Sequence, residues 1–148
     1  MFTFSFLVAA VITGFFATVL MTITVMVIRT VTHVHMSMPL MLGSMMAPHS
    51  PDAWKRRIGM MMHLGIGSFY GFVFGLLIQK EIFFDLTILS GVIFALILWM
   101  IMMVMVLPMR GMGFFGFARD KRISVAALIG HLVYGISFVV LLPLIFLN

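Results

Sequence analysis

The chain has 148 residues, of which 64% are hydrophobic and only 9% are charged, and its mean hydropathy is +1.26. A soluble domain of this size needs far more polar surface, so the composition excludes a soluble globular protein and predicts an integral membrane protein. The net charge of +5 does not indicate nucleic-acid binding, because the basic residues lie beside apolar stretches. Since the sequence has no cysteine, disulfides and thiolate metal sites are also excluded.

Four stretches are long and apolar enough to cross a bilayer, which takes about 20 residues of helix. They cover residues 4–28, 58–78, 83–107 and 123–146. No basic segment and no convincing cleavage site accompany the first stretch, so we expect it to be retained as a span. The sequence therefore predicts a single all-α membrane domain over residues 1–148, with four transmembrane helices and both termini on one side.

The basic residues predict the orientation of the spans. Eight of the nine Lys and Arg residues lie in the connections after the first and third spans, whereas the middle connection carries Lys80, Glu81 and Asp85. By the positive-inside rule, the two basic connections are expected in the cytoplasm and both termini outside. The expected location is the inner (cytoplasmic) membrane of a bacterium, with periplasmic termini.

The two halves of the chain, residues 1–80 and 81–148, have a similar layout. His63 and His131 are 68 residues apart, and Gly67 and Gly135 have the same separation. Each half contains one helix, a basic loop with Pro and Gly, and a second helix that opens on His-Leu. This pattern predicts two parallel-repeat helical hairpins related by a pseudo-twofold axis along the membrane normal.

Small residues recur at every fourth position in these spans, which places them along one side of each helix. In lipid, helices associate where small residues let the backbones approach and where polar groups find partners. The expected packing residues are Gly59, Gly67, Gly71 and Gly75 in the second span, Gly14 and Thr18 in the first, and Ala127 and Gly135 in the last.

Three short motifs carry a resemblance to a known family. They lie at residues 41–46 (Met-Leu-Gly-Ser-Met-Met), at residues 60–63 (Met-Met-Met-His), and at residues 130–135, which contain His-Leu-Val-Tyr-Gly in the last span. Together they resemble a family of small four-span bacterial membrane proteins of unknown function. The resemblance implies the four-span architecture, and it implies no catalytic residues.

His63 and His131 are the first candidates for a binding site. Each lies one to two turns inside the cytoplasmic end of its predicted helix, and the predicted axis brings them face to face. Two imidazoles in this arrangement could ligate haem iron or a metal ion. In the other interpretation, each imidazole hydrogen-bonds to a neighbouring helix and ties the bundle together.

The first cytoplasmic connection is the second candidate, as a copper site. It contains His33, His35, Met36, Met38 and His49, and thioethers with imidazoles are the ligands that suit Cu(I). Methionine is abundant throughout the chain, with 17 residues, so the same cluster is also explained by ordinary composition.

A third feature is the segment from Arg110 to Phe117, in which aromatic residues alternate with glycine. It is followed by the basic residues Arg119, Lys121 and Arg122. This pattern suits a segment lying in the bilayer interface, with the cations over anionic lipid headgroups.

No Asp or Glu lies well inside a predicted span, which argues against proton-coupled transport and carboxylate catalysis. We therefore expect no enzyme activity. The leading hypothesis is a non-catalytic accessory or structural subunit of a larger membrane complex, such as an electron-transfer or oxygenase complex, in contact with partner subunits and lipids. The alternative is a haem- or copper-binding membrane protein that uses His63 and His131, or the His33 to His49 segment.

Overall fold

The computed structural model describes residues 4–34, 37–82 and 85–146, and all regular elements in these ranges are helical. Two of the predicted copper ligands, His35 and Met36, and the first residue of the predicted third span, Phe83, lie outside the described residues.

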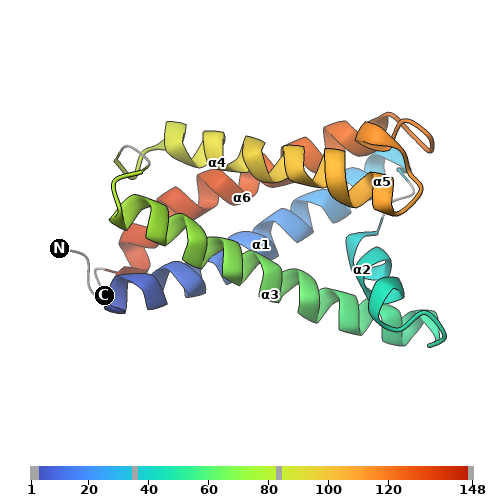
Figure 1. Ribbon diagram of the computed structural model, residues 1–148, viewed down its shortest axis with the longest axis horizontal. Coiled ribbons are helices and arrows are strands. Elements are labelled where there is room, and N and C mark those ends of the chain that lie inside the picture. The colour runs from blue at the N-terminus through green and yellow to red at the C-terminus, as the bar shows by residue number, and fades with distance from the viewer. Residues whose placement is uncertain (1–3, 35–36, 83–84, 147–148) are drawn as a thin grey trace.

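Four long helical segments run alongside one another, and each is long and apolar enough to cross a membrane (Figure 1). The prediction of an all-helical protein with four such segments is therefore confirmed. The segments are α1 (Phe4–Thr32), α3 (Asp52–Gln79), the continuous run Ile88–Met109, and α6 (Arg122–Phe146). The run consists of α4 (Ile88–Ile101), a π-helical turn (Met102–Val106) and α5 (Leu107–Met109).

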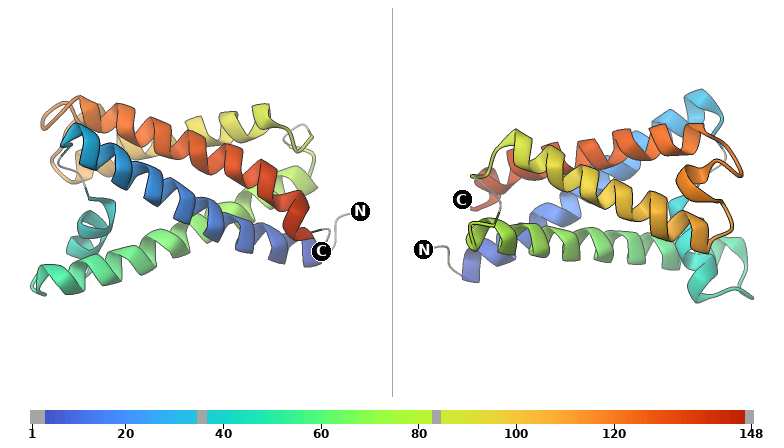
Figure 2. Two further views of the ribbon diagram at one scale, coloured as in Figure 1. Left: turned by 180° about the vertical axis from the view of Figure 1, so that it is seen from behind. Right: turned by 45° about the horizontal axis from the view of Figure 1, so that its top comes forward.

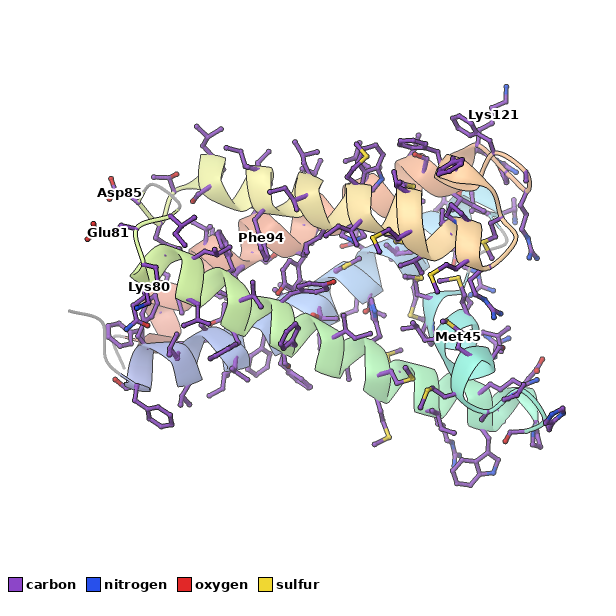
Figure 3. All side chains as sticks on the ribbon, in the orientation of Figure 1. Met45, Lys80, Glu81, Asp85, Phe94 and Lys121 are labelled. Carbon is purple, nitrogen blue, oxygen red and sulfur yellow. The ribbon has the colours of Figure 1, made fainter. Side chains whose placement is uncertain are left out.

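Both termini lie at one end of the bundle, and the short helix α2 (Met38–Met46) lies at the other end (Figure 1). Lys80, Glu81 and Asp85 are found at the end that holds the termini, whereas Lys121 is at the α2 end (Figure 3). We call the second end the basic end, because it collects the residues of the two basic connections.

Helix α1 lies between α3 and α6 and packs against both (Figure 2). Helix α4 packs against the other side of α6, and α2 packs against the first part of α3. Between α3 and α4, in contrast, the contact depends on large side chains. The rings of Phe74 and Phe94 stack with their centroids 4.3 Å apart, and Phe94 lies on the inner side of α4 (Figure 3).

Two of the helices begin at positions that differ from the expected starts of the spans. Helix α3 begins at Asp52 instead of residue 58, because Asp52 is an acidic residue in the first turn and pairs with Lys55 at 3.5 Å. Lys55, Arg56 and Arg57 are therefore helical. Helix α4 begins at Ile88 instead of residue 83, because Thr87 and Ser90 form a capping box at its N-terminus.

The interpretation of residues 38–46 as loop is also wrong, because they form α2. Ser37 caps this helix by accepting a hydrogen bond from the backbone N–H of Leu40 at 3.4 Å, and Pro39 stands in its first turn. Gly43 then lets α2 approach the backbone of Lys55 in α3.

The run Ile88–Met109 widens into a π-helical turn just before Pro108. The backbone N–H of Leu107 donates to the carbonyl of Met102, five residues earlier, instead of four. Proline lacks an N–H and disturbs the helix around the preceding turn, which accounts for the wider turn at this position.

Candidate functional site

Helices α1 and α3 are in direct backbone contact. A Cβ placed on Gly71 would lie 2.5 Å from the carbonyl oxygen of Ala10 and 2.7 Å from the Cα of Gly14. A Cβ on Gly67 would overlap the side chain of Thr18. Only glycine permits such a short separation, so the sequence spacing of these residues is matched by a close helix pair.

The other predicted packing residues lie in several interfaces. Gly75 also faces α1, whereas Gly59 faces the backbone of α2 at Pro39. Gly135 meets α4, where a Cβ on Gly91 would lie 2.5 Å from the carbonyl oxygen of Gly135. Ala127 is buried in the apolar cluster at the basic end.

Tyr134 joins α6 to α3. Its hydroxyl donates a hydrogen bond of 2.8 Å to the carbonyl of Gly67, and its side chain is 2% exposed. Gly67 therefore contacts α1 through Thr18 and α6 through Tyr134. Sequence reasoning missed this residue, although it lies three positions after His131, and thus on the same side of α6.

His63, His131 and Tyr134 line one cavity of about 160 Å³ in the middle of the bundle. Its walls come from α1, α2, α3, α6 and the run Ile88–Met109, and they include Met102 and Val106 of the π-helical turn. The structure thus places both histidines at one cavity, on the side of the bundle where the backbones of α3 and α4 stay apart.

The two imidazoles have different hydrogen-bonding roles. The Nδ1 atom of His131 lies 2.7 Å from the carbonyl oxygen of Ala127. Since a carbonyl only accepts, Nδ1 carries the proton, and the Nε2 atom of the neutral ring keeps its lone pair. His63 is only 9% exposed, and it makes no hydrogen bond to another described residue. Both rings are therefore available to a ligand in the cavity.

The volume of the cavity limits what it can hold. Pockets for drug-sized ligands measure roughly 300–1,000 Å³, so a cavity of about 160 Å³ is too small to enclose a haem macrocycle. A small ion or a small polar molecule therefore suits the volume of this pocket better than a macrocycle does.

The predicted copper ligands that the structure describes are spread around α2. His33 follows the end of α1, Met38 begins α2 and lines the central cavity, and His49 is exposed in the turn after α2. Among the described residues, no group of three or more His, Cys, Asp or Glu side chains is placed to hold a metal ion.

These features define a small α-helical membrane protein with four apolar helices around a cavity lined by two histidines. The chain belongs to the family DUF6789, a family of unknown function whose sequence profile matches residues 5–147. No curated protein and no solved structure matches the chain. The prediction of a family of unknown function is thus confirmed.

Proposed function

We propose that the protein is a non-catalytic accessory subunit of a larger membrane complex. The observation that carries this proposal is Gly65 in α3. A Cβ placed on Gly65 would have no atom within 4 Å, whereas a Cβ on each of the other glycines in the described α-helices would lie within 3 Å of another atom of the chain. Gly65 therefore contributes no close contact within the bundle.

Gly65 lies between two large side chains on the outer face of α3. Met61 and Phe69, one turn away on either side, are 74% and 60% exposed. Glycine costs a helix about 1 kcal/mol relative to alanine, and no contact of this chain offsets that cost at Gly65. Transmembrane helices pack closely where a small residue leaves a groove between large side chains. We therefore expect a helix of a partner subunit to pack against α3 at Gly65.

The acidic residues support a role without catalysis. Asp52, Glu81, Asp85 and Asp120 all lie at helix ends or in connections, away from the middle of the bundle. Carboxylates at membrane depth are the usual groups for proton transfer and acid–base catalysis. An electron-transfer or oxygenase complex is the class of assembly that we propose to search first.

The orientation proposed for this subunit follows from its charges. The basic end would face the cytoplasm and both termini the periplasm of a bacterial inner membrane. The position of Lys121 at one end and of Glu81 and Asp85 at the other supports this arrangement (Figure 3).

The glycine contacts support an internal repeat of two parallel hairpins. Gly14 of α1 meets Gly67 and Gly71 of α3, and Gly91 of α4 meets Gly135 and Val139 of α6. Gly67 and Gly135 differ by 68 positions in the sequence, as do Gly71 and Val139. A similar glycine contact thus recurs at equivalent positions of α3 and α6, although Gly14 and Gly91 on the partner helices are 77 positions apart.

The accessory-subunit proposal is tested by replacing Gly65 with leucine. The variant should fold normally, because the added side chain meets open space. The amount of co-purifying partner should fall by at least about tenfold, because the leucine side chain fills the space into which the partner helix packs. The matched control is Val140→Phe, which adds bulk to an exposed position on α6. Quantitative mass spectrometry of tagged protein from native membranes measures the partner. If Gly65→Leu retains its partners as well as the control does, the outer face of α3 is not the interface.

The central cavity supports a second candidate, a metal-binding membrane protein, because His63 is buried without a hydrogen-bond partner in the described part of the chain. This candidate predicts one equivalent of metal, or a visible absorption band, that is lost in the double variant His63→Ala/His131→Ala. The matched control is His33→Ala/His49→Ala, which removes two exposed histidines at the basic end. Loss of the metal in the control variant alone would assign the metal to the segment from His33 to His49. Absence of metal from the wild type would reject both sites.

A further inference from the structure

Three arginines from separate segments meet at one crevice of the basic end. Arg29 stands in the last turn of α1, Arg110 follows α5, and Arg119 lies between the Phe114–Gly116 turn and α6. With Ser37, which caps α2, and Ser44 within α2, they line a volume of about 290 Å³. We call this volume the arginine crevice.

No carboxylate is among the residues that line the arginine crevice. The two ion pairs in the described part of the chain are Lys55 with Asp52 and Arg122 with Asp120. The other acidic residues, Glu81 and Asp85, lie at the opposite end of the bundle (Figure 3). Arginines that line one crevice with no carboxylate in its lining attract an anion, and their planar guanidinium donors match the oxygens of a phosphate.

An apolar crevice of about 220 Å³ continues from the same place. It shares Arg29 and Ser37 with the arginine crevice, and it runs between α1 and α3 toward His63. Its lining along the two helices includes Met26 of α1 and Met60 of α3. A site for a soluble anion does not require this apolar extension, whereas an anion that carries a hydrocarbon chain does.

We propose that this pair of crevices binds one anionic phospholipid, with its phosphate between Arg29, Arg110 and Arg119 and an acyl chain between α1 and α3. The arrangement resembles the bilayer itself, in which basic side chains meet headgroups at the interface and apolar side chains meet the chains below. This proposal does not depend on the accessory-subunit proposal, because it uses none of the residues Met61, Gly65 and Phe69 that form the Gly65 face.

The experiment measures binding of phosphatidylglycerol and phosphatidylcholine to the delipidated, detergent-solubilised full chain by native mass spectrometry. The wild type should prefer phosphatidylglycerol by at least about tenfold. The variant Arg110→Gln/Arg119→Gln should lose this preference. The control Arg57→Gln/Lys121→Gln removes the same charge from exposed positions of the basic end outside the arginine crevice, and it should keep the preference.

Two further arms separate a lipid from a free anion. Inorganic phosphate at millimolar concentration should compete poorly with phosphatidylglycerol, and Met60→Trp, which fills the apolar crevice, should weaken phosphatidylglycerol binding several-fold. Equal loss of preference in both charge variants would overturn the site, because the attraction would then come from the overall charge. If phosphate competes effectively with phosphatidylglycerol and Met60→Trp has no effect on binding, the lipid assignment is overturned and the crevice is a site for a free anion.

Discussion

Replacing Gly71 with alanine is expected to destabilise the bundle by about 3 kcal/mol, the upper part of the range for overpacked sites. The new Cβ would lie 2.5 Å from the Ala10 carbonyl and 2.7 Å from the Gly14 Cα, and both of these atoms belong to the backbone of α1. No side-chain rotation relieves such a contact, so the two helices have to separate. Thermal unfolding of the purified protein in detergent measures the effect.

The matched control for this prediction is the same substitution at Gly65, six positions earlier in the same helix. A Cβ at Gly65 meets open space, so Gly65→Ala should leave the stability of the isolated protein unchanged or raise it by up to about 1 kcal/mol through helix propensity. Equal destabilisation by the two variants would contradict the assignment of the effect of Gly71→Ala to the α1–α3 contact.

Removing the ring of Phe74 is the second change with a large expected effect. Phe74 is fully buried, stacks on Phe94 of α4 and lies 5.0 Å from Phe138 of α6, measured between ring centroids. Large-to-small changes at buried aromatic residues cost about 3–5 kcal/mol. The void left by the Phe74 ring would lie at the place where α3 and α4 depend on side chains for their contact. Phe74→Ala should therefore lower the unfolding temperature strongly.

The control for Phe74→Ala is Phe69→Ala in the same helix. Phe69 is exposed on the outer face of α3, so its truncation removes no internal contact with α4 or α6. We expect a change in stability within about 0.5 kcal/mol, as for other surface substitutions. A loss as large as that of Phe74→Ala would contradict the assignment of the aromatic contact as the link between α3 and α4.

The helix pair α1–α3 could be predicted from the sequence because close packing in lipid leaves a direct pattern. Small residues four positions apart, such as Gly67 and Gly71, are needed where two backbones touch, and Gly14 and Thr18 supply the partner surface. The pattern does not say which helix each glycine meets. Gly59 continues the spacing in α3 but faces α2, a helix that the sequence analysis interpreted as loop.

The histidine cavity could be predicted only in part. The equal spacing of the repeat suggested that His63 and His131 approach one another, and both line the same cavity. Its volume depends on the π-helical turn before Pro108 and on the separation of α3 from α4, which arise from the packing of whole helices. Tyr134 was missed for a similar reason. Its partner is the backbone carbonyl of Gly67, and a backbone acceptor cannot be recognised from the types of side chain in the sequence.

The arginine crevice shows the same limit. The sequence predicted basic residues at the bilayer interface, but Arg29 and Arg110 are 81 positions apart. They come together because α1 and the run Ile88–Met109 both end at the basic end of the bundle. A charge count therefore gives the side of the membrane, whereas only the fold gives the cluster.

The most direct test of the accessory-subunit proposal is the mass of the wild-type protein after mild-detergent purification from its native membrane, with an absorption spectrum of the same sample. The account predicts a complex in which this chain and larger membrane subunits occur in fixed stoichiometry, with no chromophore held by this chain. A solitary chain that carries haem or a metal would contradict it, and would make His63 and His131 the functional site.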